Sequence, residues 1–167
     1  MLLNLLLIRH AKSSWANPNL SDFDRPLNKR GKHNAPLMGK RINGYEMQID
    51  TIISSPARRA KETAKIIAKE VGFFEKNINY EIGLYHASLD IFIKVLSDQK
   101  KENIMMVGHN PGIQEFSYWL CSEPRINFPT CGAILISFNL QEWSELNKYC
   151  GTIRSFEYPK MFYEENI

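Results

Sequence analysis

Two histidines and two arginines stand just beyond apolar stretches of this chain. Arg9 and His10 follow LLLI, Arg59 comes soon after DTIIS, and His109 follows NIMMVG. A neutral imidazole can act as a nucleophile and form a labile P–N bond, and arginine binds anionic oxygens through a planar, permanently charged fork of donors. A second histidine, protonated beside a phosphate dianion, adds another donor. These residue types together predict phosphoryl transfer through a phosphohistidine intermediate.

The apolar stretches before these residues are typical of strands buried on both faces of a parallel sheet. We expect strands over residues 2–8, 50–54 and 103–107, with a weaker strand over 80–84. Two later strands are expected in CGAILISFNL and TIRSFEY, beside the others or at the sheet edge. Because parallel strands present their carboxyl ends at one edge, where α/β folds bind ligands, the four residues should converge there.

Helical patterns alternate with these strands. Asn28 is expected to cap a helix over residues 28–43 that Gly44 ends, and Ser55 with Pro56 to open a helix that ends at Gly72. A third helix should start after Ser88. A fourth should start at Asn110, which is expected to be its N-cap because a proline follows it, as at Ser55. The alternation predicts a three-layer α/β/α sandwich with a mostly parallel central sheet, formed as a single domain over residues 1–167.

Composition restricts the possible partners. A net charge of +3 and short basic stretches do not indicate a nucleic-acid-binding protein, and an anionic small ligand fits better. No stretch has the roughly 20 apolar residues of a membrane helix, and MLLNLLLI lacks the basic leader of a signal peptide. The three cysteines form no CxxC pair. We therefore expect a cytoplasmic protein that needs no metal or cofactor.

Four ordered motifs resemble those of the histidine phosphatase superfamily, the phosphoglycerate mutase-like proteins. The motifs are LLLIRHAKSSW, DRPLNKRG, SSPARRAKETA and VGHNPG. The compact length of the chain and the forms RPLxxxG and GHNPG resemble the small SixA-type phosphohistidine phosphatases. The resemblance implies a phosphoglycerate mutase-like fold, a phosphohistidine on His10, phosphate held by Arg9 and Arg59, and His109 as the second histidine. It selects Arg59 over Arg58, which helical periodicity alone does not distinguish.

The resemblance also implies further substrate-binding residues, and the sequence differs from the family pattern in two respects. Ser13 and Arg25 match positions near the phosphate pocket of relatives, so both are expected to bind substrate. Ala11 stands where many relatives have glycine. Relatives that cleave phosphate esters use a carboxylate in or after the third strand, where this chain offers Glu81 and His86 as candidate general acids.

A weak or missing general acid favours one substrate class. An alkoxide leaving group needs a proton donor, whereas the imidazole that leaves from a phosphoramidate needs much less help. We therefore expect hydrolysis of phosphohistidine in a protein partner. A phosphatase of small phosphomonoesters and a non-catalytic phosphate-binding module are the alternatives. Whether the loop over residues 15–25 closes over substrate is left open.

Overall fold

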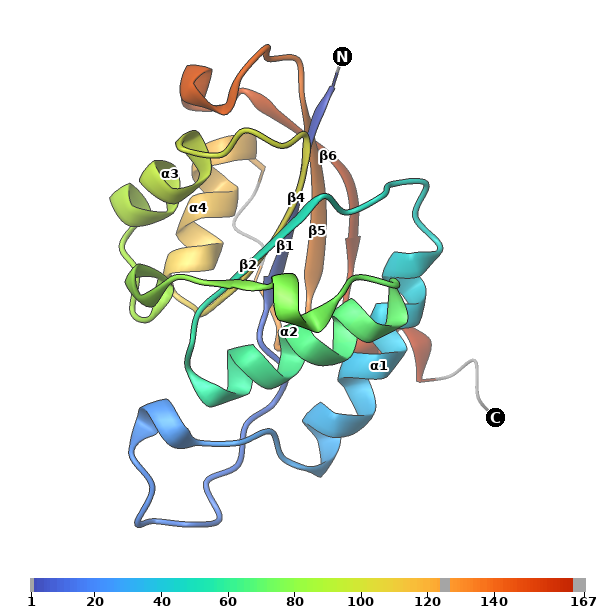
Figure 1. The fold of residues 1–167 in the computed structure, drawn as a ribbon, viewed down its shortest axis with the longest axis vertical. Helices are drawn as coiled ribbons and strands as arrows, with labels where there is room; N and C mark the ends of the chain where they lie inside the picture. Colours follow the sequence, from blue (N-terminus) through green and yellow to red (C-terminus); the bar gives the residue numbers. More distant parts are fainter. Residues whose placement is uncertain (1, 124–126, 164–167) are drawn as a thin grey trace.

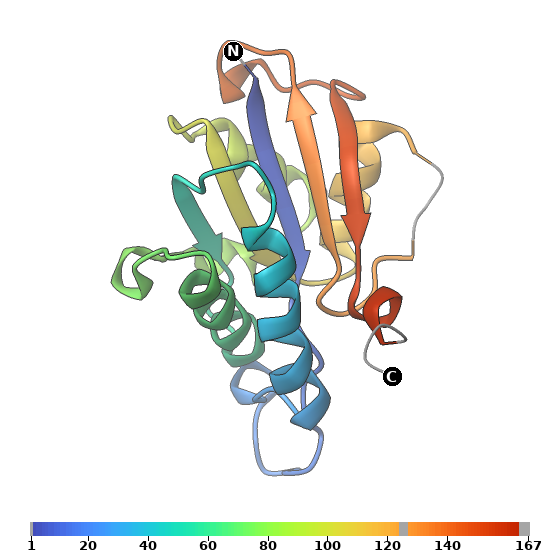
Figure 2. The same cartoon turned by 90° about the vertical axis from the view of Figure 1, so that its right-hand side faces the viewer.

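The structure is a computed structural model that describes residues 2–123 and 127–163. Its described strands form one sheet in the order β3-β2-β4-β1-β5-β6. They are β1 (Leu3–Arg9), β2 (Thr51–Ser54), β3 (Asn79–Tyr80), β4 (Asn103–Gly108), β5 (Ala133–Phe138) and β6 (Gly151–Glu157). In Figure 2 the blue β1 lies between β4 and the orange β5.

The sheet is mixed rather than mostly parallel. The first four strands pair in parallel, as expected, in the pairs β1–β4, β2–β4 and β2–β3. In contrast, β5 lies antiparallel to β1, and β6 lies antiparallel to β5. The antiparallel arrangement follows from the chain's path, because β5 starts next to the carboxyl end of β1 and runs back along it. The expected positions of the two late strands, beside the others and at the edge, are confirmed.

Helices cover both faces of this sheet, which confirms the three-layer arrangement. α1 (Lys29–Asn43) and α2 (Arg58–Glu70) lie on one face, and α3 (Leu89–Ser97) and α4 (Gly112–Cys121) on the other, as Figure 1 shows. Two separate apolar cores result, one on each side of the sheet. Alternate residues of β1 enter opposite cores, which explains why this strand is apolar almost throughout. Among the described helices none is long and apolar enough to cross a membrane.

Several element boundaries differ from the sequence expectations. Asn28 caps α1 as expected, since its side chain accepts a hydrogen bond from the Gly31 amide at 2.9 Å. Ser55 does not cap α2, which begins three residues later at Arg58, and the expected cap at Asn110 is also wrong. The expected strand over 80–84 is a short β3 followed by a 3₁₀ turn over Ile82–Leu84.

Candidate functional site

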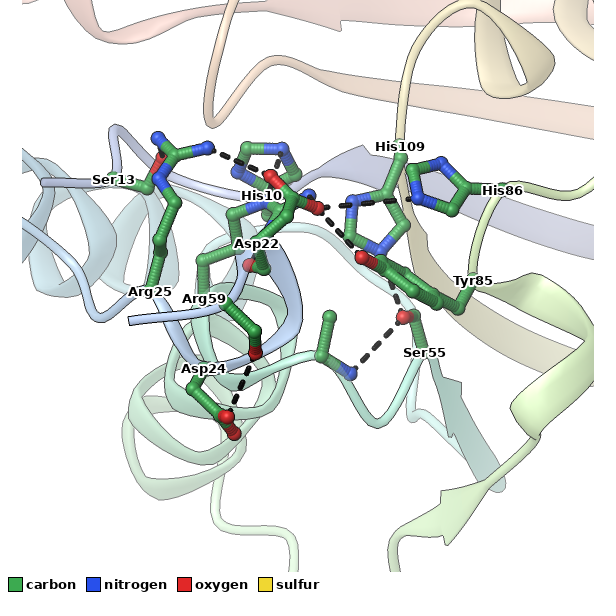
Figure 3. A network of polar contacts seen from close by, with 12 residues as sticks. His10, Ser13, Asp22, Asp24, Arg25, Ser55, Arg59, Tyr85, His86 and His109 are labelled. Atoms are coloured by element: carbon green, nitrogen blue, oxygen red, sulfur yellow. Dashed lines mark hydrogen bonds and ion pairs between the residues drawn. The ribbon is translucent and has the colours of Figure 1, made fainter. Parts of the chain in front are cut away.

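Strand register brings the two histidines together at the carboxyl edge of the sheet. Arg9 of β1 pairs with Gly108 of β4, so His10 and His109 are each the next residue on adjacent parallel strands. The His10 amide continues the ladder by donating to the Gly108 carbonyl oxygen at 3.1 Å. The two imidazole rings lie 5.0 Å apart between centroids. Both side chains are buried, and Figure 3 shows them side by side.

The contacts of His10 define its tautomer. Nδ1 lies 2.7 Å from the carbonyl oxygen of Ala11, which can only accept, so Nδ1 carries the proton. In the neutral ring Nε2 therefore has a free lone pair, toward which Arg59 Nε donates at 3.4 Å. Burial, together with the neighbouring His109 and two arginines, lowers the pKa of His10 well below its ordinary value. His10 is thus a neutral imidazole with Nε2 unprotonated.

Adjacent arginines at the start of α2 have different surroundings. Arg59 is 6% exposed and points back toward His10, whereas Arg58 is exposed and donates from Nε to Glu62 Oε1 at 2.9 Å. The Thr63 hydroxyl fixes this part of the helix against β1, since it donates to the Arg59 carbonyl oxygen at 2.7 Å and accepts from the Ala11 amide at 3.0 Å. The structure therefore brings Arg59, and not Arg58, to the histidines.

Arg9 completes a crowded set of cations. Its Nη1 donates to the Phe128 carbonyl oxygen at 2.9 Å, which ties the end of β1 to the segment before β5. Burial and the nearby charge of Arg59 lower the pKa of the Arg9 guanidinium. Among the described residues, Arg9 Nε is buried without a hydrogen-bond partner. An anion bound close to Arg9 would offset the nearby charge of Arg59, so this position is suited to an anionic ligand.

His109 is held by a residue that the sequence analysis assigned to another role. Ser55, which follows β2 at the same sheet edge, places its hydroxyl oxygen 2.7 Å from His109 Nε2. Burial and the cation of Arg59 lower the pKa of His109 to about 3, so the ring is neutral at neutral pH. In the described part of the chain, His109 Nδ1 and the neighbouring Asn110 Oδ1 are buried and lack hydrogen-bond partners.

The loop between β1 and α1 brings further polar groups to the site. Arg25 is buried, donates to the Ser13 hydroxyl and to the Ser14 carbonyl oxygen, and stacks on the exposed ring of Trp15. Asp22 accepts from Arg25, Arg59 and the Tyr85 hydroxyl. Sequence analysis missed Asp22 because an aperiodic polar loop gives no indication of which carboxylate faces inward.

A cavity of about 240 Å³ joins these residues. Its lining comprises Arg9, His10, Lys12, Ser13, Trp15, Arg25, Arg59, His86, His109, Asn110 and Thr130. Among the described residues that line it, none is an aspartate or a glutamate. In the same described part of the chain, no group of side chains is suited to hold a metal ion.

The two candidate general acids are placed differently. Glu81 is not among the cavity residues, and its carboxylate accepts from the Gly83 amide at 3.1 Å instead. His86 lies at the rim of the cavity with its side chain 69% exposed and its Nε2 3.9 Å from Asp22 Oδ2. The structure therefore brings His86 near the histidines and leaves Glu81 outside.

Comparisons with known proteins identify the family of this chain. The model of the histidine phosphatase superfamily (branch 1) matches residues 5–89. An uncharacterised chloroplastic protein of Arabidopsis thaliana is 33% identical over 151 residues, which cover 84% of this chain and 69% of that protein. An uncharacterised Mycobacterium tuberculosis protein is 26% identical over 165 residues, which cover 92% of this chain and 100% of that protein.

Solved structures share the whole arrangement. A candidate phosphohistidine phosphatase SixA from Agrobacterium tumefaciens superposes with a TM-score of 0.81 at 25% identity, covering 94% of this chain and 98% of that one. The protein histidine phosphatase SixA complexed with tungstate has the same fold, with a TM-score of 0.81 at 18% identity and coverage of 96% and 99%. The chain therefore belongs to the histidine phosphatase superfamily and is a phosphatase with a SixA-type fold.

Proposed function

We propose that this phosphatase works through a covalent phosphohistidine on Nε2 of His10 and needs no metal. The observation that carries the proposal is the hydrogen bond from His10 Nδ1 to the Ala11 carbonyl oxygen, which leaves Nε2 unprotonated and therefore nucleophilic. The lowered pKa of His10 supports the same role, because a nucleophile must be unprotonated at working pH.

The reaction then has two displacements at phosphorus. The Nε2 lone pair forms the new P–N bond while the bond to the leaving group breaks, and the leaving group departs with that electron pair and takes up a proton from solvent. Water next forms a P–O bond while the P–N bond breaks and its electron pair returns to Nε2. Inorganic phosphate is released, and the attacking water returns one proton to solvent. We propose Arg9 and Arg59 as the cations that bind the equatorial oxygens in both steps.

His109 is proposed as a hydrogen-bond donor that becomes protonated when the substrate binds. The ring is neutral in the unliganded protein because its pKa is about 3. A phosphoryl dianion nearby favours the protonated form and raises that pKa. The unpartnered atoms at Arg9 Nε and His109 Nδ1 support a ligand with several acceptor oxygens at this position. Ser13 and Arg25, which line the cavity, are proposed to contact the same substrate.

The lining of the cavity favours phosphohistidine in a protein partner as the substrate. General acid catalysis contributes about 10²–10⁴ in rate where the leaving group needs a proton. No carboxylate lines the described part of the cavity, so an alkoxide would leave without a carboxylic acid to protonate it. An imidazole leaves from a phosphoramidate with far less help. We propose a cytoplasmic setting for this reaction, although the Arabidopsis relative is chloroplastic.

A phosphatase of small phosphomonoesters is the second candidate, and the position of His86 at the rim favours it. His86 lines the cavity, and an imidazolium at this position would serve as the proton donor for an alkoxide leaving group. This candidate predicts rapid ester hydrolysis that falls by about 10²-fold or more on changing His86→Asn, while Glu81→Gln leaves the rate unchanged because Glu81 lies outside the cavity. A non-catalytic phosphate-binding module would bind phosphate without turnover.

One experiment separates these candidates. The protein is incubated with a phosphohistidine-bearing protein and with a panel of phosphate esters, and turnover is measured beside acid-labile phosphate trapped on His10. The proposal expects trapped phosphate, fast hydrolysis of phosphohistidine and slow hydrolysis of esters. A His10→Ala variant that keeps full turnover would refute the mechanism, and faster ester hydrolysis would select the second candidate.

A further inference from the structure

The carboxylate of Asp22 is bound to three groups around the site. Its Oδ2 accepts from Arg59 Nη2 at 3.0 Å and from the Tyr85 hydroxyl at 2.6 Å, and its Oδ1 accepts from Arg25 Nη1 at 3.0 Å. Its backbone carbonyl oxygen also accepts from Arg59 Nη1 at 2.7 Å. Figure 3 shows the side chain between Arg59 and Tyr85. Asp22 therefore occupies both terminal nitrogens of one guanidinium group.

These contacts determine which way the guanidinium of Arg59 faces. While one N–H of Nη1 and one of Nη2 bind Asp22, the Nε–H donates toward His10 Nε2, the atom proposed to attack phosphorus. Asp22 itself is not among the residues that line the cavity. It acts on the site through the cavity residues that it contacts, Arg59 and Arg25, and through its negative charge near His109. Of these, Arg59 is the one that donates to His10.

Asp22 also remains an anion throughout the working range of pH. Although its partial burial acts in the opposite direction, hydrogen bonds from Tyr85, Arg25 and Arg59 lower the pKa of the carboxyl group below its ordinary value. A carboxylate in this state can accept hydrogen bonds and balance charge. It has no proton to donate to a leaving group, which excludes the role of general acid.

We propose that Asp22 is a positioning residue that directs Arg59 toward His10 and competes with the phosphoryl group for the Nη2 edge of that arginine. The proposal rests on the proposed function, because it assumes that Arg59 binds the phosphoryl group on His10. An arginine released from Asp22 is free to surround a bound phosphate, but it is less well aligned when the transition state forms. Loss of the Asp22 charge should therefore lower the rate without weakening ground-state binding of phosphate.

The test compares two carboxylates of one short turn. Asp22→Asn keeps the size of the side chain and removes the charge that pairs with Arg59. Asp24→Asn is the matched control, because Asp24 lies in the same 3₁₀ turn and its carboxylate accepts only from Ser21 among the described contacts. For each variant, kcat and KM are measured with a phosphohistidine-bearing protein. Titration calorimetry gives the affinity for inorganic phosphate, a measurement that needs no turnover.

The expected result is a split between rate and binding. In Asp22→Asn, kcat falls roughly tenfold, the loss expected for one charge-assisted hydrogen bond, while phosphate binds as tightly as in the parent or a few times more tightly. Asp24→Asn changes neither value by more than about twofold. Tyr85→Phe, which loosens Asp22 without removing it, lowers kcat by a smaller factor and gives a second test if the Asp22 variant is poorly folded.

Three results would overturn the proposal. These are an unchanged kcat in Asp22→Asn, a loss of phosphate affinity parallel to the loss of rate, and an Asp24→Asn variant that behaves like Asp22→Asn. Failure of the proposed function would look different, because the parent protein would then bind phosphate without turning over any substrate. In that case the calorimetry alone decides: phosphate binding to Asp22→Asn that is at least as tight supports competition at Arg59, and weaker binding rejects it.

Discussion

The neighbouring arginines of α2 give the sharpest test of how the site works. We expect Arg59→Ala to abolish most of the activity and Arg58→Ala to leave it unchanged, although the two residues are adjacent and carry the same charge. Arg59 is 6% exposed and donates toward His10. The side chain of Arg58 is 53% exposed and forms an ion pair with Glu62, which lies one helical turn further along α2. Long-range charge is thus nearly the same in both variants, and only contact with the phosphoryl group differs.

The size of each effect follows from these contacts. Two charge-assisted hydrogen bonds from Arg59 to phosphoryl oxygens, at about 1.5–3 kcal/mol each, correspond to a fall of roughly 10²–10⁴ in kcat/KM. The exposed pair between Arg58 and Glu62 contributes only about 0.3–0.5 kcal/mol to stability. Arg58→Ala should therefore unfold almost as the parent does and retain its rate.

The assay is kcat/KM for a phosphohistidine-bearing protein, measured beside urea unfolding to show that both variants are folded. Arg59→Lys adds a finer comparison, because an ammonium keeps the charge but lacks the planar fork of donors. The reasoning is refuted if Arg59→Ala retains more than about a tenth of the parent kcat/KM, or if Arg58→Ala loses as much as Arg59→Ala.

Three further outcomes are expected. The acid limb of kcat/KM should lie well below pH 6.5, because burial and the nearby His109 lower the pKa of His10; a limb at or above pH 6.5 would contradict this. As the pH is lowered from about 6.5 to 3, the free energy of unfolding should fall by up to about 1.4 kcal/mol per pH unit because of His109. In this range His109 is protonated in the unfolded chain but not in the folded protein. In urea titrations, His109→Asn should show a smaller dependence of the unfolding free energy on pH. Gly31→Ala should lower Tm by several degrees, because the added Cβ would collide with the Lys12 carbonyl oxygen. Gly44→Ala, at the other end of α1, should lower Tm by less.

Strand periodicity was sufficient to predict how the histidines come together. Apolar runs of the right length identify β1 and β4, and parallel pairing in register then places His10 beside His109. The same rule could have found Ser55, which follows β2 at that edge and contacts His109. The pattern Ser-Pro before a helix has two physical explanations, a cap or a functional serine, and local sequence does not decide between them.

Other features depend on contacts between distant segments. The antiparallel entry of β5 beside β1 depends on where the loop after α4 returns to the sheet, which no periodicity encodes. Asp22 is one of several acidic residues in a polar loop, and its inward position results from Arg59 and Tyr85, which come from later segments. Sequence analysis therefore finds residues held by regular elements more readily than residues held by other side chains.

The motif glycines show how backbone packing connects these elements to the chemistry. Gly31, in the first turn of α1, lies against the backbone of Lys12, which is two residues after His10. Gly112 is the first residue of α4, follows His109 by three residues and lies against the Ala87 carbonyl oxygen. A side chain at Gly31 would push α1 away from the segment after β1, and a side chain at Gly112 would push α4 away from Ala87. The positions of the two histidines thus depend on close backbone contacts on both faces of the sheet, and a methyl group at Gly31 or Gly112 should reduce activity although neither glycine lines the cavity.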